Sequence, residues 1–214
     1  MKKIIGKMLI LSILAMGISF FTTTGLAFAD SEALYRTGTD TNPWQHAGVR
    51  KGGVGVYEIK GYNHTVDLNT FASFVGTETY LGAFTNPLMT ATDKSKVQST
   101  LALMEADTDI NYVGLNMIDA DFNPGEYLSP DEIDDIRCDG VVEYAYEWNN
   151  IPVWGRTDTG TSSGTPTHFD VSKVSYISEH QNLGGNQPWF EASPLIQRGG
   201  AGTAWTKLRQ TTPN

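Results

Sequence analysis

The chain has one cysteine among its 214 residues, and this scarcity limits what that cysteine can do. Because no second cysteine exists, Cys138 has no partner for an internal disulfide, and a disulfide-stapled scaffold is excluded. Cys138 is therefore an intermolecular bridge, an inert buried residue, or a free thiol with a chemical role. We take the third role as the leading hypothesis and look for the residues that would support it.

Other signatures are also missing. The four histidines have no zinc-ligand spacing, and no phosphate-binding glycine loop follows a predicted strand. Lys and Arg number 15 against 24 Asp and Glu, so the formal net charge is −9. This balance argues against nucleic acid and anionic membrane surfaces as partners. We therefore expect no metal, no cofactor and no nucleic-acid partner.

Residues 1–29 have the pattern of a secretory signal peptide. Three lysines precede an apolar run from Met8 to Phe21, and Ala27-Phe28-Ala29 has the small-x-small pattern of a signal-peptidase site. The run is short for a membrane span, and no second long apolar stretch follows it. We predict that the mature chain begins near Asp30, is secreted into the extracellular cell envelope, and has no membrane span after signal cleavage.

Residues 30–214 suffice for a single domain, and their pattern predicts an α+β fold with antiparallel strand pairs. Two strands, 44–50 and 54–60, are expected around the turn Lys51-Gly52-Gly53, after an irregular lead-in over 30–43. Helices are predicted over 93–106, briefly after the capping serine Ser129, and over 138–148. Short strands are expected within 64–75, 78–84 and 110–118, and the chain after 155 is predicted to be an irregular tail with one strand over 170–179.

Cys138 stands at the predicted start of a helix, directly after Arg137. Free N–H groups at a helix start and a neighbouring guanidinium both favour the thiolate. The four acids at positions 131, 132, 134 and 135 oppose it. Cys138 is also in register with Val142 and Ala145, so its position fits a nucleophile and a core residue equally well.

A thiol nucleophile needs a base, and the base needs an orienting partner. If the hairpin turns on three residues centred at Gly52, His46 lies directly opposite Glu58 with Cβ atoms about 5 Å apart. A carboxylate in that place would orient the imidazole and raise its pKa. A two-residue turn at Gly52-Gly53 would put Ile59 opposite His46 instead, and a surface His–Glu pair is the simpler interpretation.

These residues resemble a known family. Arg137-Cys138-Asp139-Gly140-Val141-Val142-Glu143-Tyr144 is similar to the Asp-Cys-Ser-Gly-Leu-Val-x-Tyr block around the nucleophile of NlpC-type papain-like cysteine peptidases. His46-Ala47-Gly48-Val49 resembles the His-x-Gly-Ile of their histidine strand, and Glu58 stands where the family has a third polar residue. Histidine precedes cysteine, as in the circularly permuted branch that includes lecithin:retinol acyltransferase-like proteins. The similarity covers about residues 44–150.

The resemblance implies a circularly permuted papain-like core, with an antiparallel sheet packed on the helix that bears Cys138. It implies a Cys138–His46–Glu58 triad that attacks an amide or ester carbonyl and forms an acyl-enzyme. A peptide, a peptidoglycan fragment or a lipid-linked amide is the substrate class that it suggests. Family members often have a tyrosine that assists the oxyanion site, and Tyr112 is the best match, with Tyr127 second. Two departures from the pattern are Asp139 in place of serine and the absence of a Gly-Asp dipeptide before the histidine strand.

Three alternatives stay open. His168, followed by Asp170, is a second candidate base. The segment 119–132 resembles an EF-hand calcium loop, but Pro124 occupies the position that requires glycine. The chain could also be a catalytically inactive binding module on the same scaffold, with glycan or peptide contacts from exposed tryptophans at positions 44, 148, 154 and 189.

Overall fold

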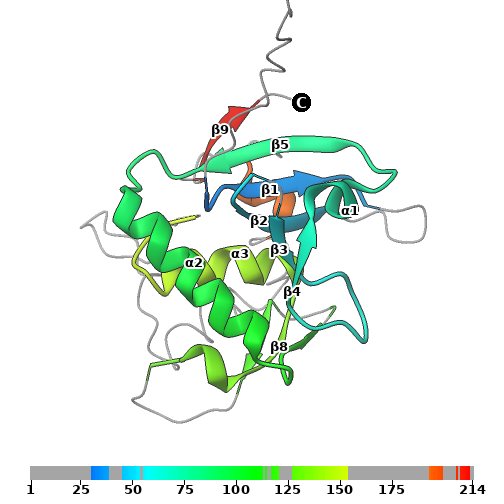
Figure 1. Ribbon diagram of the computed structural model, residues 1–214, viewed down its shortest axis with the longest axis vertical. Helices are drawn as coiled ribbons and strands as arrows, with labels where there is room; N and C mark the ends of the chain where they lie inside the picture. Colours follow the sequence, from blue (N-terminus) through cyan, green and yellow to red (C-terminus); the bar gives the residue numbers. More distant parts are fainter. Residues whose placement is uncertain are drawn as a thin grey trace, which may run out of the picture.

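A six-stranded antiparallel sheet forms the centre of the molecule in the computed structural model (Figure 1). The structure describes residues 30–38, 45–53, 55–112, 114, 117–120, 127–153, 193–199, 206 and 208–212. The strand order is β4-β3-β2-β1-β5-β9, and every neighbouring pair is antiparallel. The strands are β1 Ala33–Arg36, β2 His46–Lys51, β3 Gly55–Glu58, β4 Asp67–Thr70, β5 Tyr80–Thr85 and β9 Arg209–Thr212. The predicted α+β class with an antiparallel sheet is confirmed.

Helices cover both faces of this sheet. The longer helices α2 (Ala91–Ala106) and α3 (Cys138–Glu147) lie on one side, and the short α1 (Phe71–Val75) contacts β3 and β4. Neighbouring residues of β1 point to opposite faces, because side chains alternate along a strand. Tyr35 belongs to the larger core with α2 and α3, while Leu34 packs with Phe74 of α1 in a smaller core.

The helix α3 is enclosed on all sides. All ten of its residues are buried, and it packs against β2 and α2. Its two tyrosines satisfy their hydroxyls inside the protein: Tyr144 donates to the Leu128 carbonyl at 2.6 Å, and Tyr146 donates to the Ser31 carbonyl. A helix held in this way places its first residue, Cys138, at a fixed position.

A second, smaller sheet leads into α3. It has the order β6-β8-β7, with β6 at Asn111–Tyr112, β7 at Ile118–Ala120 and β8 at Ile133–Ile136, and β6 runs parallel to β8. Before β8, Ser129 and Glu132 form the predicted capping box around the 3-10 turn η1 (Pro130–Glu132). The strand β8 ends one residue before Arg137, which caps α3, so this sheet sets where α3 and Cys138 begin.

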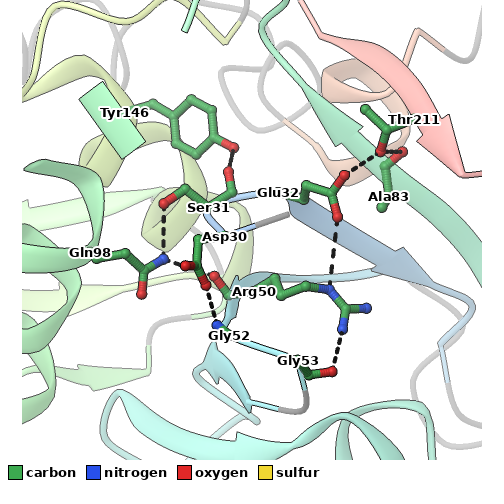
Figure 2. A network of polar contacts seen from close by, with 10 residues as sticks. All are labelled: Asp30, Ser31, Glu32, Arg50, Gly52, Gly53, Ala83, Gln98, Tyr146 and Thr211. Atoms are coloured by element: carbon green, nitrogen blue, oxygen red, sulfur yellow. Dashed lines mark hydrogen bonds and ion pairs between the residues drawn. The ribbon is translucent and has the colours of Figure 1, made fainter. Parts of the chain in front are cut away.

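A network of polar contacts joins the start of β1 to the rest of the fold (Figure 2). Arg50 has no solvent exposure, and its Nε lies 3.9 Å from Glu32 Oε2. The Glu32 carboxylate also accepts from Thr211 of β9 at 2.6 Å. Gln98 of α2 donates to the Ser31 hydroxyl at 2.9 Å, and the Ser31 carbonyl accepts from Tyr146 of α3. The network thus fixes β1 against α2, α3 and β9.

Two predictions about the chain ends need correction. Residues 33–36 were expected in an irregular lead-in but form β1, which lies between β2 and β5 in the sheet. A strand of four residues is too short to show a clear alternation, so its sequence gave no signal. Parts of the predicted irregular tail form α6 (Pro194–Gln197) and β9, while the strand predicted over 170–179 lies outside the described residues.

None of the helices in the described part of the chain combines the length and apolar character that crossing a bilayer requires.

Candidate active site

Cys138 is the first residue of α3 and is 7% exposed. The backbone N–H of Arg137 donates to the Met117 carbonyl at 2.9 Å, which fastens the helix start to the smaller sheet. Glycine at position 140 permits this packing, because a Cβ there would lie 2.5 Å from the Met117 carbonyl oxygen and 2.7 Å from Ile136 Cγ1. Gly140, two residues after Cys138, therefore allows α3 to pack closely against the smaller sheet inside the protein.

His46 is the first residue of β2, and its ring is paired with Glu58, the last residue of β3. The two atoms His46 Nε2 and Glu58 Oε2 are 2.8 Å apart, and the glutamate side chain has no solvent exposure. This pair was predicted from the hairpin, and the structure brings it together.

The register that produces the pair differs from the prediction. Lys51 pairs with Gly55 and Val49 with Tyr57, so the three-residue turn is centred at Gly53 and not at Gly52. His46 and Glu58 are therefore diagonal neighbours, not directly opposite residues. A shift of two residues keeps both side chains on one face, and long side chains still reach a diagonal partner.

The His46 ring also interacts electrostatically with Cys138. Burial disfavours the protonated ring, but the negative charge of Cys138 and hydrogen bonds with Cys138 and Glu58 outweigh it and raise the pKa of His46 to about 9. The nearby guanidinium of Arg36 acts in the opposite direction. The structure thus brings the Cys138 thiol, the His46 imidazole and the Glu58 carboxylate near one another in that order.

The residues on either side of Cys138 form a salt bridge with each other. Arg137 Nε lies 2.9 Å from Asp139 Oδ1, and its NH2 lies 2.6 Å from Asp139 Oδ2. Burial disfavours the charged guanidinium, but the charge and hydrogen bonds of Asp139 outweigh it and raise the pKa of Arg137. Arg137 was expected to support the thiolate, and the charge of Cys138 also raises the pKa of Arg137, but the guanidinium is shared with Asp139.

Tyr112 lies close to Cys138. It pairs with Ile136 in the parallel β6–β8 ladder, two residues before Cys138. Burial raises the pKa of the Tyr112 phenol, and the charges of Cys138 and Asp139 raise it further, so the hydroxyl stays protonated and able to donate. Tyr127, the second match, is 67% exposed. The ring of Tyr62, which the sequence analysis did not single out, lies edge-on to Tyr112 at 5.3 Å and is 71% exposed.

A buried network braces the first turns of α3. Gln197 of α6 donates from Nε2 to the Asp139 carbonyl at 3.0 Å and to Glu143 Oε2 at 2.6 Å, and its Oε1 accepts from Tyr35 at 3.2 Å. Sequence reasoning missed Gln197. It lies 58 positions after Asp139, in the predicted irregular tail, and no local sequence pattern predicts a contact over that distance.

The remaining candidates are placed elsewhere or not described. His64 is exposed in the connection between β3 and β4. Trp148 stacks on Tyr144 at the far end of α3, about 15 Å along the helix from Cys138. His168, His180 and the tryptophans at 44, 154 and 189 lie outside the described residues. The part of the chain that the structure describes holds no group of three or more side chains suited to a metal ion, and residues 121–126 of the calcium-loop candidate lie outside it.

The arrangement can support nucleophilic catalysis, because a thiol at a helix start meets a base that is itself oriented by a buried acid. The helix start adds backbone N–H groups that have no acceptor within α3. Comparison of the chain with protein-family models, with curated proteins and with solved structures gave no match.

Proposed function

We propose that the protein is a secreted cysteine hydrolase that cleaves an amide bond through an acyl-enzyme. Cys138 is the nucleophile, His46 the base and Glu58 the residue that orients the base. The observation that carries the proposal is the buried His46–Glu58 pair at 2.8 Å, whose imidazole interacts electrostatically with Cys138 at the start of α3. A circularly permuted papain-like core belongs to the same proposal and is supported by α3 packed on the strand that bears His46.

The proton transfers follow from the ring geometry. Glu58 holds His46 Nε2, so Nδ1 is the nitrogen left for the thiol proton. The thiolate attacks the carbonyl carbon, a C–S bond forms, and the carbonyl oxygen becomes an oxyanion. The proton then passes from Nδ1 to the leaving nitrogen as the C–N bond breaks. Nδ1 then takes a proton from a water molecule as the water oxygen attacks the thioester carbon. The C–S bond breaks, the acid leaves, and the sulfur takes the proton from Nδ1 to become the free thiol.

The oxyanion has donors on two sides. The first N–H groups of α3 lack intrahelical acceptors and carry the positive end of the helix dipole. The Tyr112 hydroxyl is protonated and lies on the strand next to β8. Donors that point at the developing charge stabilise the tetrahedral intermediate. The substrate classes that we propose are a peptide, a peptidoglycan fragment or a lipid-linked amide.

A catalytically inactive binding module is the second candidate function. It is favoured by the 7% exposure of Cys138 and by the salt bridge that ties Asp139 to Arg137. Such a module would bind ligand in both the wild type and a Cys138→Ser variant and would form no acyl-enzyme.

The test measures alkylation of Cys138 by iodoacetamide at neutral pH, with mass spectrometry to locate the adduct. We expect His46→Ala to slow the reaction by at least about tenfold, because the thiolate loses its imidazolium partner. The exposed His64→Ala is the matched control and should leave the rate unchanged. Mass spectrometry of the enzyme mixed with a panel of activated amides and esters should show an acyl group on Cys138. Equal alkylation rates in the wild type and His46→Ala, with no acyl adduct, would exclude the hydrolase.

A further inference from the structure

The short helix α6 is tied to the start of α3 by its last residue, Gln197. Gln197 has no solvent exposure, and its Nε2 donates to the Asp139 carbonyl at 3.0 Å and to Glu143 Oε2 at 2.6 Å. Asp139 directly follows Cys138, and Glu143 lies about one helical turn later. Two donations from one amide group therefore hold the turn of α3 that carries the proposed nucleophile.

The same amide group is tied to the sheet beside the strand that carries His46. Gln197 Oε1 accepts from the hydroxyl of Tyr35 at 3.2 Å. Tyr35 is fully buried in β1 and pairs with Ala47 of β2, which is the residue after His46. Gln197 thus connects α3 to the sheet next to the proposed base.

Arg198, the residue after α6, supplies a second link to the sheet. Its Nε donates to Gln45 Oε1 at 2.8 Å, and Gln45 directly precedes His46 at the start of β2. The turn between the two links is itself held at both ends. Ser193 caps the first turn of α6, and Thr206 donates to the carbonyl of its last residue. The helix α6 therefore joins the start of α3 to the start of β2.

We propose that Gln197 and Arg198 are positioning residues: through α6 they hold the proposed nucleophile and base at the separation that proton transfer requires. Cys138 and His46 come from different elements, so neither α3 nor β2 alone fixes the distance between them. Proton transfer needs a heavy-atom separation of about 2.6–3.2 Å, and a displacement of about 1 Å can slow a positioned reaction about a hundredfold. The inference rests on the proposed function, because it concerns the geometry of the same thiol and imidazole.

Alkylation of Cys138 by iodoacetamide reports this separation, because the proposed base assists the thiolate. Gln197→Met keeps the side-chain volume and removes the three hydrogen bonds of the amide. We expect it to lower the alkylation rate at neutral pH about tenfold. In the His46→Ala background the same change should have no further effect, because the base that Gln197 positions is gone.

The pKa of His46, measured by NMR titration, is a second readout, and a loss of stability alone does not move it. Burial lowers this pKa, but the charge of Cys138 and hydrogen bonding outweigh burial and raise it to about 9. A larger separation weakens the contribution of Cys138, so Gln197→Met should lower the pKa of His46 by about one unit.

Gln98→Met is the matched control. Gln98 also links a helix to the sheet, since it donates to the Ser31 hydroxyl at 2.9 Å and to the Arg50 carbonyl at 2.8 Å (Figure 2). Arg50 lies four residues from His46, near the other end of β2. The control should therefore change neither the alkylation rate nor the pKa of His46.

Two variants test the second link at positions that are only partly buried, and they decide the question if Gln197→Met does not fold. Arg198→Met and Gln45→Met should each slow alkylation and lower the pKa of His46. The double variant should be no slower than either single one, because both changes remove the same hydrogen bond.

The positioning role is overturned if Gln197→Met or Arg198→Met keeps the wild-type rate and the wild-type pKa of His46. It is also overturned if Gln98→Met slows alkylation as much, or if Gln197→Met causes an equal further loss in the His46→Ala background, since both results indicate a merely structural role. In each of these cases the hydrolase proposal stands. A wild-type rate no higher than that of His46→Ala overturns both proposals.

Discussion

Replacing Glu58 with glutamine measures how much the buried carboxylate contributes to the protonated His46 ring. The His46 Nε2 to Glu58 Oε2 distance is 2.8 Å and the Glu58 side chain has no exposure, so solvent screens the pair little. A hydrogen bond to a charged group contributes about 1.5–3 kcal/mol, and one pKa unit corresponds to about 1.4 kcal/mol. Glu58→Gln should therefore lower the pKa of His46 by roughly one to two units from its value of about 9.

The assay is an NMR titration of the His46 imidazole in protein labelled with ¹⁵N at histidine. Resonances are assigned by comparison with His46→Gln, and the exposed His64 serves as an internal reference that should not move. The isosteric glutamine keeps the volume of the site, so a change of pKa reports the lost charge. If the pKa of His46 stays the same in Glu58→Gln, the carboxylate does not hold the ring proton and the reasoning is wrong.

Two further predictions concern stability. The pKa of His46 is about 9 in the folded chain and about 6.5 unfolded, so the protonated ring adds stability that is full below about pH 6.5 and lost as pH rises through 9. We compare the free energy of unfolding in urea of the wild type with that of His46→Gln. The difference between them should fall by about 3 kcal/mol from pH 6.5 to pH 9. A difference that is constant, or that grows with pH, contradicts this prediction. Gly140→Ala should destabilise the fold by about 1–3 kcal/mol, because the added Cβ overpacks against Met117 and Ile136. Gly53→Ala is the control, because a Cβ there meets open space, and it should not destabilise the fold. Equal midpoints of urea unfolding for the two variants would contradict this packing.

The hairpin shows why part of the site could be predicted from local sequence. Glycines at positions 52 and 53 indicate a turn, and strand alternation then assigns His46 and Glu58 to one face. The centre of the turn was predicted one residue too early, which moves the register by two. An even shift preserves the face, and a glutamate reaches its diagonal neighbour, so the pair survived an incorrect register.

The parts that the sequence did not predict depend on contacts between distant segments. The strand β1 has four residues, and its place between β2 and β5 follows from pairing on both edges, which no local pattern encodes. Gln197 reaches Asp139 and Glu143 from the other side of a long connection. The salt bridge of Arg137 was missed for a related reason, because helix-start electrostatics alone do not reveal that Asp139 turns back to pair with it.

The bond between Thr211 and Glu32 joins two residues that are 179 positions apart along the chain. A short linker across this contact, with a new opening in the connection between β5 and α2, would give a polypeptide in which Cys138 precedes His46. Its helices and strands could remain those in Figure 1. The order of Cys138 and His46 along the chain is therefore decided by where the backbone begins and ends, and the geometry of the site does not depend on it.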